Sequence, residues 1–202
     1  FEKFGNFVLA QPHDGARGGR LGAELAARGR RVLRKWVRVR GHVLADVASF
    51  FERSMALRAM AWLAVHVRLT DKCECNGRPL SALEAEVGRF TEALGCDGVL
   101  LCADDAGAKE ALAQRLRGRG MEVAEYPALL SARALPAHKD HTLDRHQNAH
   151  DMLVECLLMA QCKALLGSWS NVAAAVVWFA PEGYQHFLFG DAAPAEKFEA
   201  VD

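Results

Sequence analysis

The segment AVHVRLTDK at residues 64–72 decides the fold. It closes an apolar run that begins at Ala59, and its last residues include His, Arg, Thr, Asp and Lys. A buried parallel strand is apolar along its length, so a strand that stops in these residues places polar groups at its carboxyl end. In open α/β sheets, ligands bind outside the carboxyl ends of the strands. We therefore expect this segment to be a strand of such a sheet and to form part of a binding site.

Strands and helices alternate along the rest of the sequence. Apolar runs predict strands over residues 62–68, 99–103, 121–126, 164–167 and 185–189. Helical spacing of apolar side chains predicts helices over residues 20–35, 42–55, 80–94, 106–116, 148–163 and 172–179. Residues 36–40 suit a short strand or an extended segment. This alternation is typical of an α/β fold with a Rossmann-like, doubly wound parallel sheet. We place the sheet in a domain of residues 59–202 and treat residues 1–58 as a basic, helical segment.

A second polar turn, GSWSN at residues 167–171, follows one of the predicted strands. It places Ser168, Ser170 and Asn171 between that strand and a helix. Backbone N–H groups at a helix N-terminus, joined by hydroxyl groups, form an anion site without any lysine. Serine is also an ordinary N-cap residue, so the turn alone does not decide between the two roles. With the first polar segment, it predicts a shared crevice for a phosphate-bearing ligand.

Charged side chains at the strand ends suit such a ligand. Arg68 carries a planar fork that matches a phosphate or carboxylate, and Lys72 adds a second positive charge. Asp71 suits a role in orienting Arg68 or Lys72, or in accepting a hydrogen bond from a sugar hydroxyl. Asp104 and Asp105 follow another predicted strand, where an aspartate is a good N-cap and two adjacent carboxylates also suit ribose hydroxyls. Surface ion pairs and helix caps are the plainer alternatives for these groups.

The composition is that of an ordinary folded protein, with 202 residues, 51% of them hydrophobic and 25% charged. The formal net charge is zero, which argues against a nucleic-acid binder driven by bulk charge. Residues 17–40 are nevertheless rich in Arg and Lys with a single acid, Glu24. This stretch is either a solvated helix face or a patch for a polyanion or an anionic membrane surface. No apolar run is long enough to predict a transmembrane segment.

Cysteine and histidine residues allow a metal hypothesis. His146 and His150 are four residues apart and would share a helix face, and Cys73 and Cys75 supply two thiols. The general base of an H-E-x-x-H site is absent, because Gln147 follows His146. We expect these histidines to lie at the surface and expect no bound metal. The sequence also lacks a P-loop, a G-x-S-x-G nucleophile elbow and a G-x-G-x-x-G turn after a strand.

Three features in this order resemble one known family: the AVHVRLTDK segment, the Asp104-Asp105 turn and the GSWSN turn. Together they resemble the fucosyltransferases that use GDP-fucose, the α1,6-fucosyltransferase and protein O-fucosyltransferase superfamily. The first segment is similar to the family's H-x-R-R-x-D motif, and the resemblance covers roughly residues 36–177. It implies a GT-B-like enzyme whose C-terminal nucleotide-sugar domain is Rossmann-like. Residues 59–202 would be that domain, and residues 1–58 a remnant or an edge of the acceptor half.

The resemblance also implies roles for individual residues. Arg68 would contact the β-phosphate of GDP and help its departure, and His66 would lie beside the nucleotide. Glu155 would accept a hydrogen bond from the guanine. The guanosine would lie near Asp104 and Asp105, and the diphosphate would be held by Ser168, Ser170 and Asn171. The expected catalytic set is Arg68, Asp71, Lys72 and Glu74.

An enzyme of this family transfers fucose from GDP-fucose to a hydroxyl with inversion at the anomeric carbon, and needs no metal or other cofactor. The implied partners are therefore the nucleotide sugar and a glycan or glycoprotein acceptor. The family also implies the secretory pathway, although the residues themselves leave the compartment open.

Two departures from the family pattern keep a second function open. Leu69 stands where the family has its second consecutive arginine, and Asn76 stands where the α1,6 enzymes have an acid after the lysine. Glu74 is the nearest carboxylate and becomes the substitute general base. The alternative function is a catalytically inactive relative that acts as a binding or structural subunit with a protein partner.

Overall fold

The computed structural model describes residues 22–54, 61–70, 78–131, 135, 139–168 and 170–194. A five-stranded sheet forms its centre, in the order β3-β2-β1-β4-β5. Every neighbouring pair of strands is parallel. The strands are β1 (Trp62–Val67), β2 (Gly98–Ala103), β3 (Glu122–Ala124), β4 (Ala164–Gly167) and β5 (Gln185–Leu188). This confirms the predicted α/β fold with a doubly wound parallel sheet.

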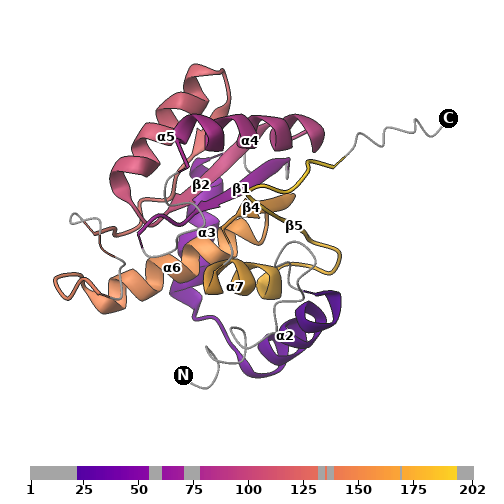
Figure 1. Cartoon of the computed structure of the whole chain (residues 1–202). Coiled ribbons are helices and arrows are strands. Elements are labelled where there is room, and N and C mark those ends of the chain that lie inside the picture. The colour runs from indigo at the N-terminus through magenta and orange to yellow at the C-terminus, as the bar shows by residue number, and fades with distance from the viewer. Residues whose placement is uncertain are drawn as a thin grey trace.

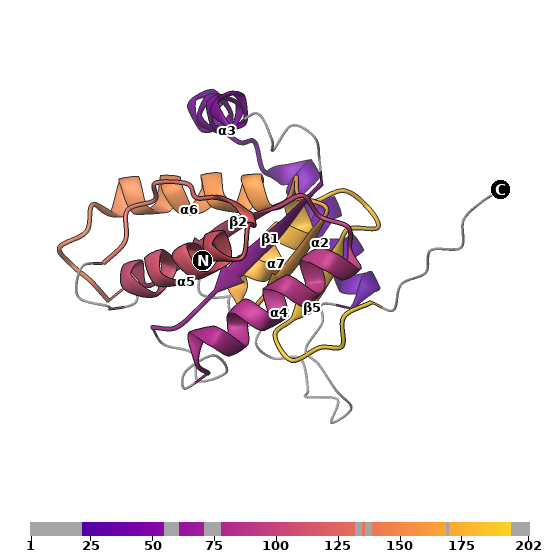
Figure 2. The same cartoon turned by 90° about the horizontal axis from the view of Figure 1, so that it is seen from above.

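Helices cover both faces of the sheet, as Figures 1 and 2 show. They are α2 (Ala23–Trp36), α3 (Gly41–Arg53), α4 (Leu80–Ala93), α5 (Ala106–Gly118), α6 (Arg145–Met159) and α7 (Asn171–Phe179). Helices α4 and α5 pack on one face, and α3, α6 and α7 contribute to the core on the other. Over the described part of the chain, no helix is both long enough and apolar enough to span a membrane.

The central strand β1 is buried along its whole length because both of its faces are covered. Side chains alternate between the faces. Leu63, Val65 and Val67 join the apolar cluster under α4 and α5, and Trp62 and Ala64 join the cluster on the other face. Burial of large apolar side chains is the main favourable contribution to folding, at about 2 kcal/mol for each. The core therefore fixes β1 as the centre from which the polar residues at its carboxyl end project.

Helices α2 and α3 pack on the same side of the sheet. Val43, Val47 and Phe50 on α3 belong to the apolar cluster that contains the side chains of β1 and α6. Helix α2 packs against α7, and a Cβ added at Gly29 would lie only 2.2 Å from the Trp178 ring. The close approach of these two helices therefore depends on the missing side chain. The predicted domain boundary at residue 58 stays a prediction.

The limits of most predicted elements differ from the structure by a few residues, and α6 differs at both ends. Helix α6 begins at Arg145, earlier than expected, because the Asp144 carboxylate caps it by accepting from the N–H groups of His146 and Gln147 at 2.8 and 3.2 Å. It ends at Met159, and the N–H of Lys163 already bonds the carbonyl of Trp62 beside the sheet. Of the two alternatives for residues 36–40, the extended segment is present rather than a strand: residues 37–40 join α2 to α3 with extended backbone at Val37 and Arg40, and Trp36 belongs to α2.

Candidate functional site at the carboxyl edge of the sheet

The two polar turns predicted from the sequence meet at the carboxyl ends of β1 and β4. These strands are neighbours, and His66 is paired with Gly167 in the register. The N–H of Ser168 donates to the carbonyl of His66 at 3.0 Å, and the N–H of Arg68 donates to the Ser168 hydroxyl at 3.3 Å. Strands β2 and β3 lie on one side of β1, and β4 and β5 lie on the other. The turns thus meet at the topological switch point, where open α/β sheets bind ligands.

Gly167 permits this close approach. A Cβ at this position would lie 2.9 Å from the His66 carbonyl oxygen and 3.2 Å from its Cβ. The backbone of a central strand cannot move aside for such a contact, whereas the end of a flexible side chain could. The glycine of the GSWSN turn is therefore required by packing against the end of β1, a role that the sequence did not reveal.

His66 is buried at the end of β1, with 6% of its surface exposed. Burial lowers the pKa of its imidazole to about 4; the Asp104 carboxylate opposes this effect and the Arg68 guanidinium adds to it. The ring is therefore neutral at pH 7, with one nitrogen able to donate and one able to accept. Among the described residues, no group lies within hydrogen-bonding distance of its buried Nδ1 atom. A ligand can supply that missing contact.

Arg68 and Leu69 leave the end of β1 in different environments. Leu69 packs against the apolar cluster under α4 and α5. Arg68 is half-buried, and its charge lies close enough to the His66 ring to influence the pKa of the imidazole. The single cation of this segment in the described residues thus stands beside His66, at the carboxyl edge of the sheet.

Asp104 fixes the backbone that follows β1. Its carboxylate accepts from the N–H of Leu69 at 2.7 Å, from the N–H of Thr70 at 3.3 Å and from the Thr70 hydroxyl. Hydrogen bonds to an ionised acceptor are about twice as strong as neutral ones. Asp104 therefore joins the end of β2 to the end of β1 and positions the segment that carries Arg68. Its predicted place near the guanosine stays a prediction.

Asp105 and Ser170 each cap a helix at this edge. The Asp105 carboxylate accepts from the N–H of Ala108 at 2.7 Å at the start of α5, and the Ser170 hydroxyl accepts from the N–H of Ala173 at 3.0 Å at the start of α7. The plainer role left open for both residues is thus present. Asn171 is the exposed first residue of α7. The positive end of the α7 dipole and its N-terminal N–H groups point to the carboxyl edge, as an anion site requires.

Glu155, on α6, belongs to a buried polar cluster with Lys109 of α5, near the carboxyl edge of the sheet. Its Oε1 atom is 3.6 Å from Nζ of Lys109, a distance too long for a direct hydrogen bond, and the Cys102 thiol is hydrogen-bonded to the carboxyl group. Burial raises the pKa of Glu155 to about 7, although the nearby Lys109 ammonium acts in the opposite direction. Oε1 has no hydrogen-bond partner within the described ranges. Cys102 is the register partner of His66, so this carboxyl group lies near the His66 end of the sheet.

The sequence did not reveal Lys109 as part of the cluster. Its ammonium is buried and donates to the carbonyl of Tyr126 at 2.9 Å. A lysine in an alanine-rich helix is normally a surface residue, and the partner carboxylate is distant in the chain. A lysine one turn after a helix-capping aspartate was the only local signal.

The two histidines of the metal hypothesis lie one turn apart on α6 but in different environments. His146 is exposed, and His150 lies between the carboxylates of Asp46 and Asp151, at 3.2 and 3.3 Å. The ring of His42 stacks on that of His150, with 5.4 Å between centroids. In the part of the chain that the structure describes, no group of three or more His, Cys, Asp or Glu side chains is arranged to hold a metal ion. His150 thus joins α3 to α6.

Three of the predicted catalytic residues lie outside the described residues: Asp71, Lys72 and Glu74. The same holds for Cys73 and Cys75, whereas Cys102, Cys156 and Cys162 are buried free thiols. The structure brings together His66, Arg68, Asp104 and Ser168 through the contacts described above. Ser170 and Asn171 lie two and three positions after Ser168 in the chain.

Solved structures with the same fold include POFUT1 in complex with GDP, at a TM-score of 0.55 and 10% identity over 84% of this chain and 51% of that one. POFUT1 in complex with GDP-fucose gives a TM-score of 0.53 and 12% identity over 85% and 51% of the two chains. NodZ α-1,6-fucosyltransferase, co-crystallised with GDP, gives a TM-score of 0.48 and 15% identity over 74% and 44%. No protein-family model matches the sequence, and no curated protein matches it.

These comparisons show a fucosyltransferase-like fold, with the parallel sheet and flanking helices of a GT-B-like enzyme. The chain spans about half the length of the solved structures that it resembles. The likeness at this low identity concerns the fold alone.

Proposed function

We propose that this chain provides the nucleotide-sugar-binding part of a fucosyltransferase, which transfers fucose from GDP-fucose to a hydroxyl of a glycan or protein with inversion. One observation carries the proposal. The polar ends of β1 and β4 meet at the switch point of a sheet whose fold is that of fucosyltransferases, with a buried neutral histidine, an arginine and a serine turn in contact.

The diphosphate of the donor would bind between Arg68 and the start of α7. The Arg68 guanidinium offers a bidentate contact to phosphate oxygens. Ser168, Ser170 and Asn171 stand where the strand gives way to the helix, and the helix N-terminus favours negative charge. The hydrogen bonds from the N–H groups of Leu69 and Thr70 to the Asp104 carboxylate hold the Arg68 backbone before the ligand arrives. Such preorganisation reduces the entropy that binding must overcome.

Glu155 would recognise the guanine. Its Oε1 atom has no hydrogen-bond partner among the described residues, and an N–H donor of the base would supply one. The raised pKa of this carboxyl group reflects its burial, so a donor from the ligand would stabilise the charged form. His66, which is neutral and has an unpaired Nδ1 within the described part of the chain, adds a contact beside the nucleotide.

In the transfer step, the acceptor oxygen would form a bond to the anomeric carbon of fucose while the bond from that carbon to the β-phosphate oxygen breaks. The electron pair of the broken bond leaves with GDP, and Arg68 with the α7 N-terminus would stabilise that charge. The proton of the acceptor hydroxyl would pass to a general base, for which we propose Glu74, near Asp71 and Lys72. By the family resemblance, we propose transfer without a metal cofactor and a place in the secretory pathway.

Calorimetric titration of GDP, in parallel with ADP and UDP, tests the donor site. We expect selective binding of GDP that Arg68→Ala weakens by at least about tenfold, because one bidentate charged contact is lost. Arg89→Ala is the matched control, because Arg89 is exposed on α4 and contacts Glu86. Equal binding of all three nucleotides, or equal loss in both variants, would argue against the proposal.

Leu69 favours a second function, that of an inactive relative which binds nucleotide as a subunit of a larger assembly. Its side chain packs into the core, so the segment lacks a second cation at that position. Release of GDP from GDP-fucose separates the two functions. A chain that binds GDP selectively but never releases it from GDP-fucose, also after a Leu69→Arg substitution, would be an inactive subunit.

A further inference from the structure

A basic surface, which we call the α2 surface, lies away from the carboxyl edge. It consists of α2 and the extended residues that follow, and it is rich in arginine and lysine with a single acid in the helix, Glu24. Its basic residues are Arg28, Arg30, Arg31, Arg34, Lys35, Arg38 and Arg40. The apolar side of α2, with Leu25 and Ala26, packs against α7 near Val177 and Trp178. The cations therefore occupy the side that faces solvent, except Arg30, which is half-buried.

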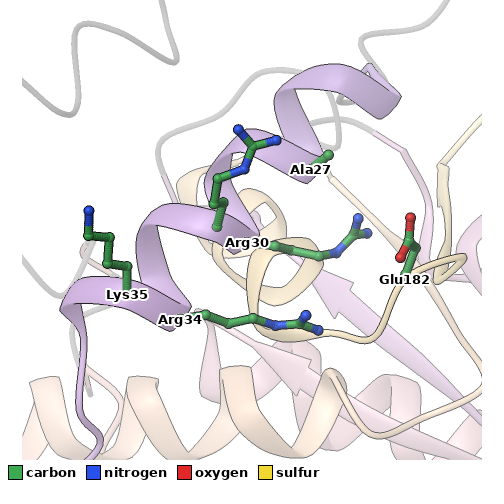
Figure 3. Close-up of a pocket in the computed structure, with 6 residues that line it drawn as sticks. Ala27, Arg30, Arg34, Lys35 and Glu182 are labelled. Atoms are coloured by element: carbon green, nitrogen blue, oxygen red, sulfur yellow. The ribbon is translucent and has the colours of Figure 1, made fainter.

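A groove of about 480 Å³ forms part of this surface, between α2 and the turn before β5. It is lined by Ala27, Arg30, Arg31, Arg34, Lys35 and Glu182. Figure 3 shows Arg34 extending from α2 toward the side on which Glu182 lies, whereas Lys35 points the other way. One carboxylate among four cations leaves the groove with an excess of positive charge. Such a surface attracts anions over about 10 Å at ordinary ionic strength.

Large apolar side chains are exposed beside these cations. Trp36, the last residue of α2, is 71% exposed, Val37 is 41% exposed, and Leu44 in the first turn of α3 is 50% exposed. The Lys35 ammonium lies 4.8 Å from the centroid of the Trp36 ring. The Arg38 guanidinium bonds the carbonyls of Arg34 and Val37. An exposed tryptophan among cations is typical of segments at a membrane–water interface.

The α2 surface is separate from the candidate nucleotide site. Helix α7 starts at the carboxyl edge with Ser170 and ends near Phe179, at the opposite edge, where the turn with Glu182 leads into β5. Gly29 on α2 contacts Trp178 at that far end of α7. Figure 1 shows α2 beyond α7, on the side away from the sheet. A ligand on this surface therefore leaves the carboxyl edge open.

We propose that the α2 surface docks the protein on an anionic lipid surface. Cations on the helix and the connection that follows would face the lipid headgroups, and Trp36 with Val37 would enter the interface. A sulfated polysaccharide or a nucleic acid would use the cations but would gain little from exposed Val37 and Leu44, so these apolar side chains favour lipid. The nucleotide site would then face away from the membrane. The proposal does not depend on the proposed function.

Sedimentation with lipid vesicles tests the proposal on the full chain. We expect binding to phosphatidylcholine vesicles with about 30% phosphatidylserine, and none to pure phosphatidylcholine vesicles. The double variant Arg31→Glu with Arg34→Glu should weaken binding at least about tenfold, because two exposed cations become acids. The double variant Trp36→Ser with Val37→Ser should weaken it several-fold without changing the net charge.

The matched control is the double variant Lys139→Glu with Arg145→Glu, which makes the same charge change at two exposed positions near the start of α6. It should bind vesicles as the unchanged protein does. Equal loss in both charge variants would show an effect of net charge alone and would overturn the proposal. Tighter binding to heparin or RNA than to the vesicles, with no effect of the Trp36 and Val37 changes, would overturn it in favour of a soluble polyanion. Absence of binding to every probe would overturn it as well.

Discussion

The carboxyl edge of the sheet and the α2 surface both gather groups that suit anions, but they hold them in different ways. At the carboxyl edge, the polar groups of β1 and β4 are buried or half-buried and are joined by hydrogen bonds between His66, Arg68 and Ser168. On the α2 surface, most of the cations are exposed along a helix and its extension. The first arrangement has fixed geometry and few charges, and the second has high charge density and exposed side chains.

This difference indicates what each region can recognise. Fixed donors and a buried carboxyl oxygen, Oε1 of Glu155, without a hydrogen-bond partner among the described residues suit a small ligand that is recognised by shape and hydrogen bonding. Exposed long side chains gain little from any single ion pair, so they act through the sum of many weak contacts with an extended anionic surface. Charge density alone would favour an anion site on α2, whereas burial and hydrogen bonding are the reasons for which we propose the nucleotide site at the end of β1.

The largest expected effect on stability comes from the Asp104 carboxylate, whose hydrogen bonds give the carboxyl edge its fixed geometry. Asp104→Ala should lower the free energy of unfolding by about 3 kcal/mol, because the N–H groups of Leu69 and Thr70 lose a charged acceptor. Its neighbour offers a matched control: Asp105→Ala removes one helix cap and should cost about 1 kcal/mol. Urea unfolding of both variants measures the difference. Equal losses of stability in the two variants would show that Asp104 stabilises the fold no more than a helix cap does.

His66 should produce the next largest effect. Burial lowers the pKa of the folded protein's imidazole from 6.5 to about 4, so the unfolded chain binds a proton in this window that the folded chain does not. The stability that His66 contributes is therefore full above pH 6.5 and falls as the pH drops toward 4, by about 2 kcal/mol between pH 7 and pH 5. Protonation of Glu155, whose pKa is raised, acts in the opposite direction over this range, so the effect is measured by urea unfolding as a difference between variants. On going from pH 7 to pH 5, the free energy of unfolding should change less favourably, by about 2 kcal/mol, in the unchanged protein and in exposed His146→Gln than in His66→Gln. The same change in all three proteins would contradict a buried neutral imidazole.

A smaller effect is expected on ligand binding through Glu155. Because burial raises the pKa of its carboxyl group to about 7, the free protein is increasingly protonated below that pH. If the charged form accepts from guanine, GDP affinity should fall by up to about tenfold for each pH unit below 7. Calorimetry at pH 8, 7 and 6 should show this slope, and Glu155→Gln should flatten it.

Glu182→Gln, on the α2 surface, is the control for the loss of one carboxylate, and it should leave the slope unchanged. A slope that persists in Glu155→Gln would remove Glu155 from the nucleotide site.

Local chemistry was enough to predict much of the fold. The strand over residues 164–167 coincides with β4, and Asp105 and Ser170 cap their helices as their residue types indicate. The polar end of the run at His66 lies at the carboxyl edge of the sheet and meets the GSWSN turn, as predicted. Each of these features depends on residues that are close together in the chain, so the sequence displays them directly.

The remaining parts of the site depend on distant partners. Asp104 accepts hydrogen bonds from residues 34 and 35 positions earlier. The buried Lys109 ammonium donates to the Tyr126 carbonyl and lies beside the Glu155 carboxyl group. No periodicity reports such pairs. The need for glycine at position 167 likewise arises from the His66 backbone, which another strand brings into contact. The limits of α6 were wrong because Asp144 supplied a cap in what resembled a polar loop.

We propose that nucleotide binds at the joined ends of β1 and β4 and not on the α2 surface. Amide hydrogen exchange with and without saturating GDP tests it most directly. We predict slower exchange at residues 66–70 and 168–173 on GDP binding, with no change over residues 22–36. Slower exchange over residues 22–36, with residues 66–70 and 168–173 unaffected, would contradict the claim.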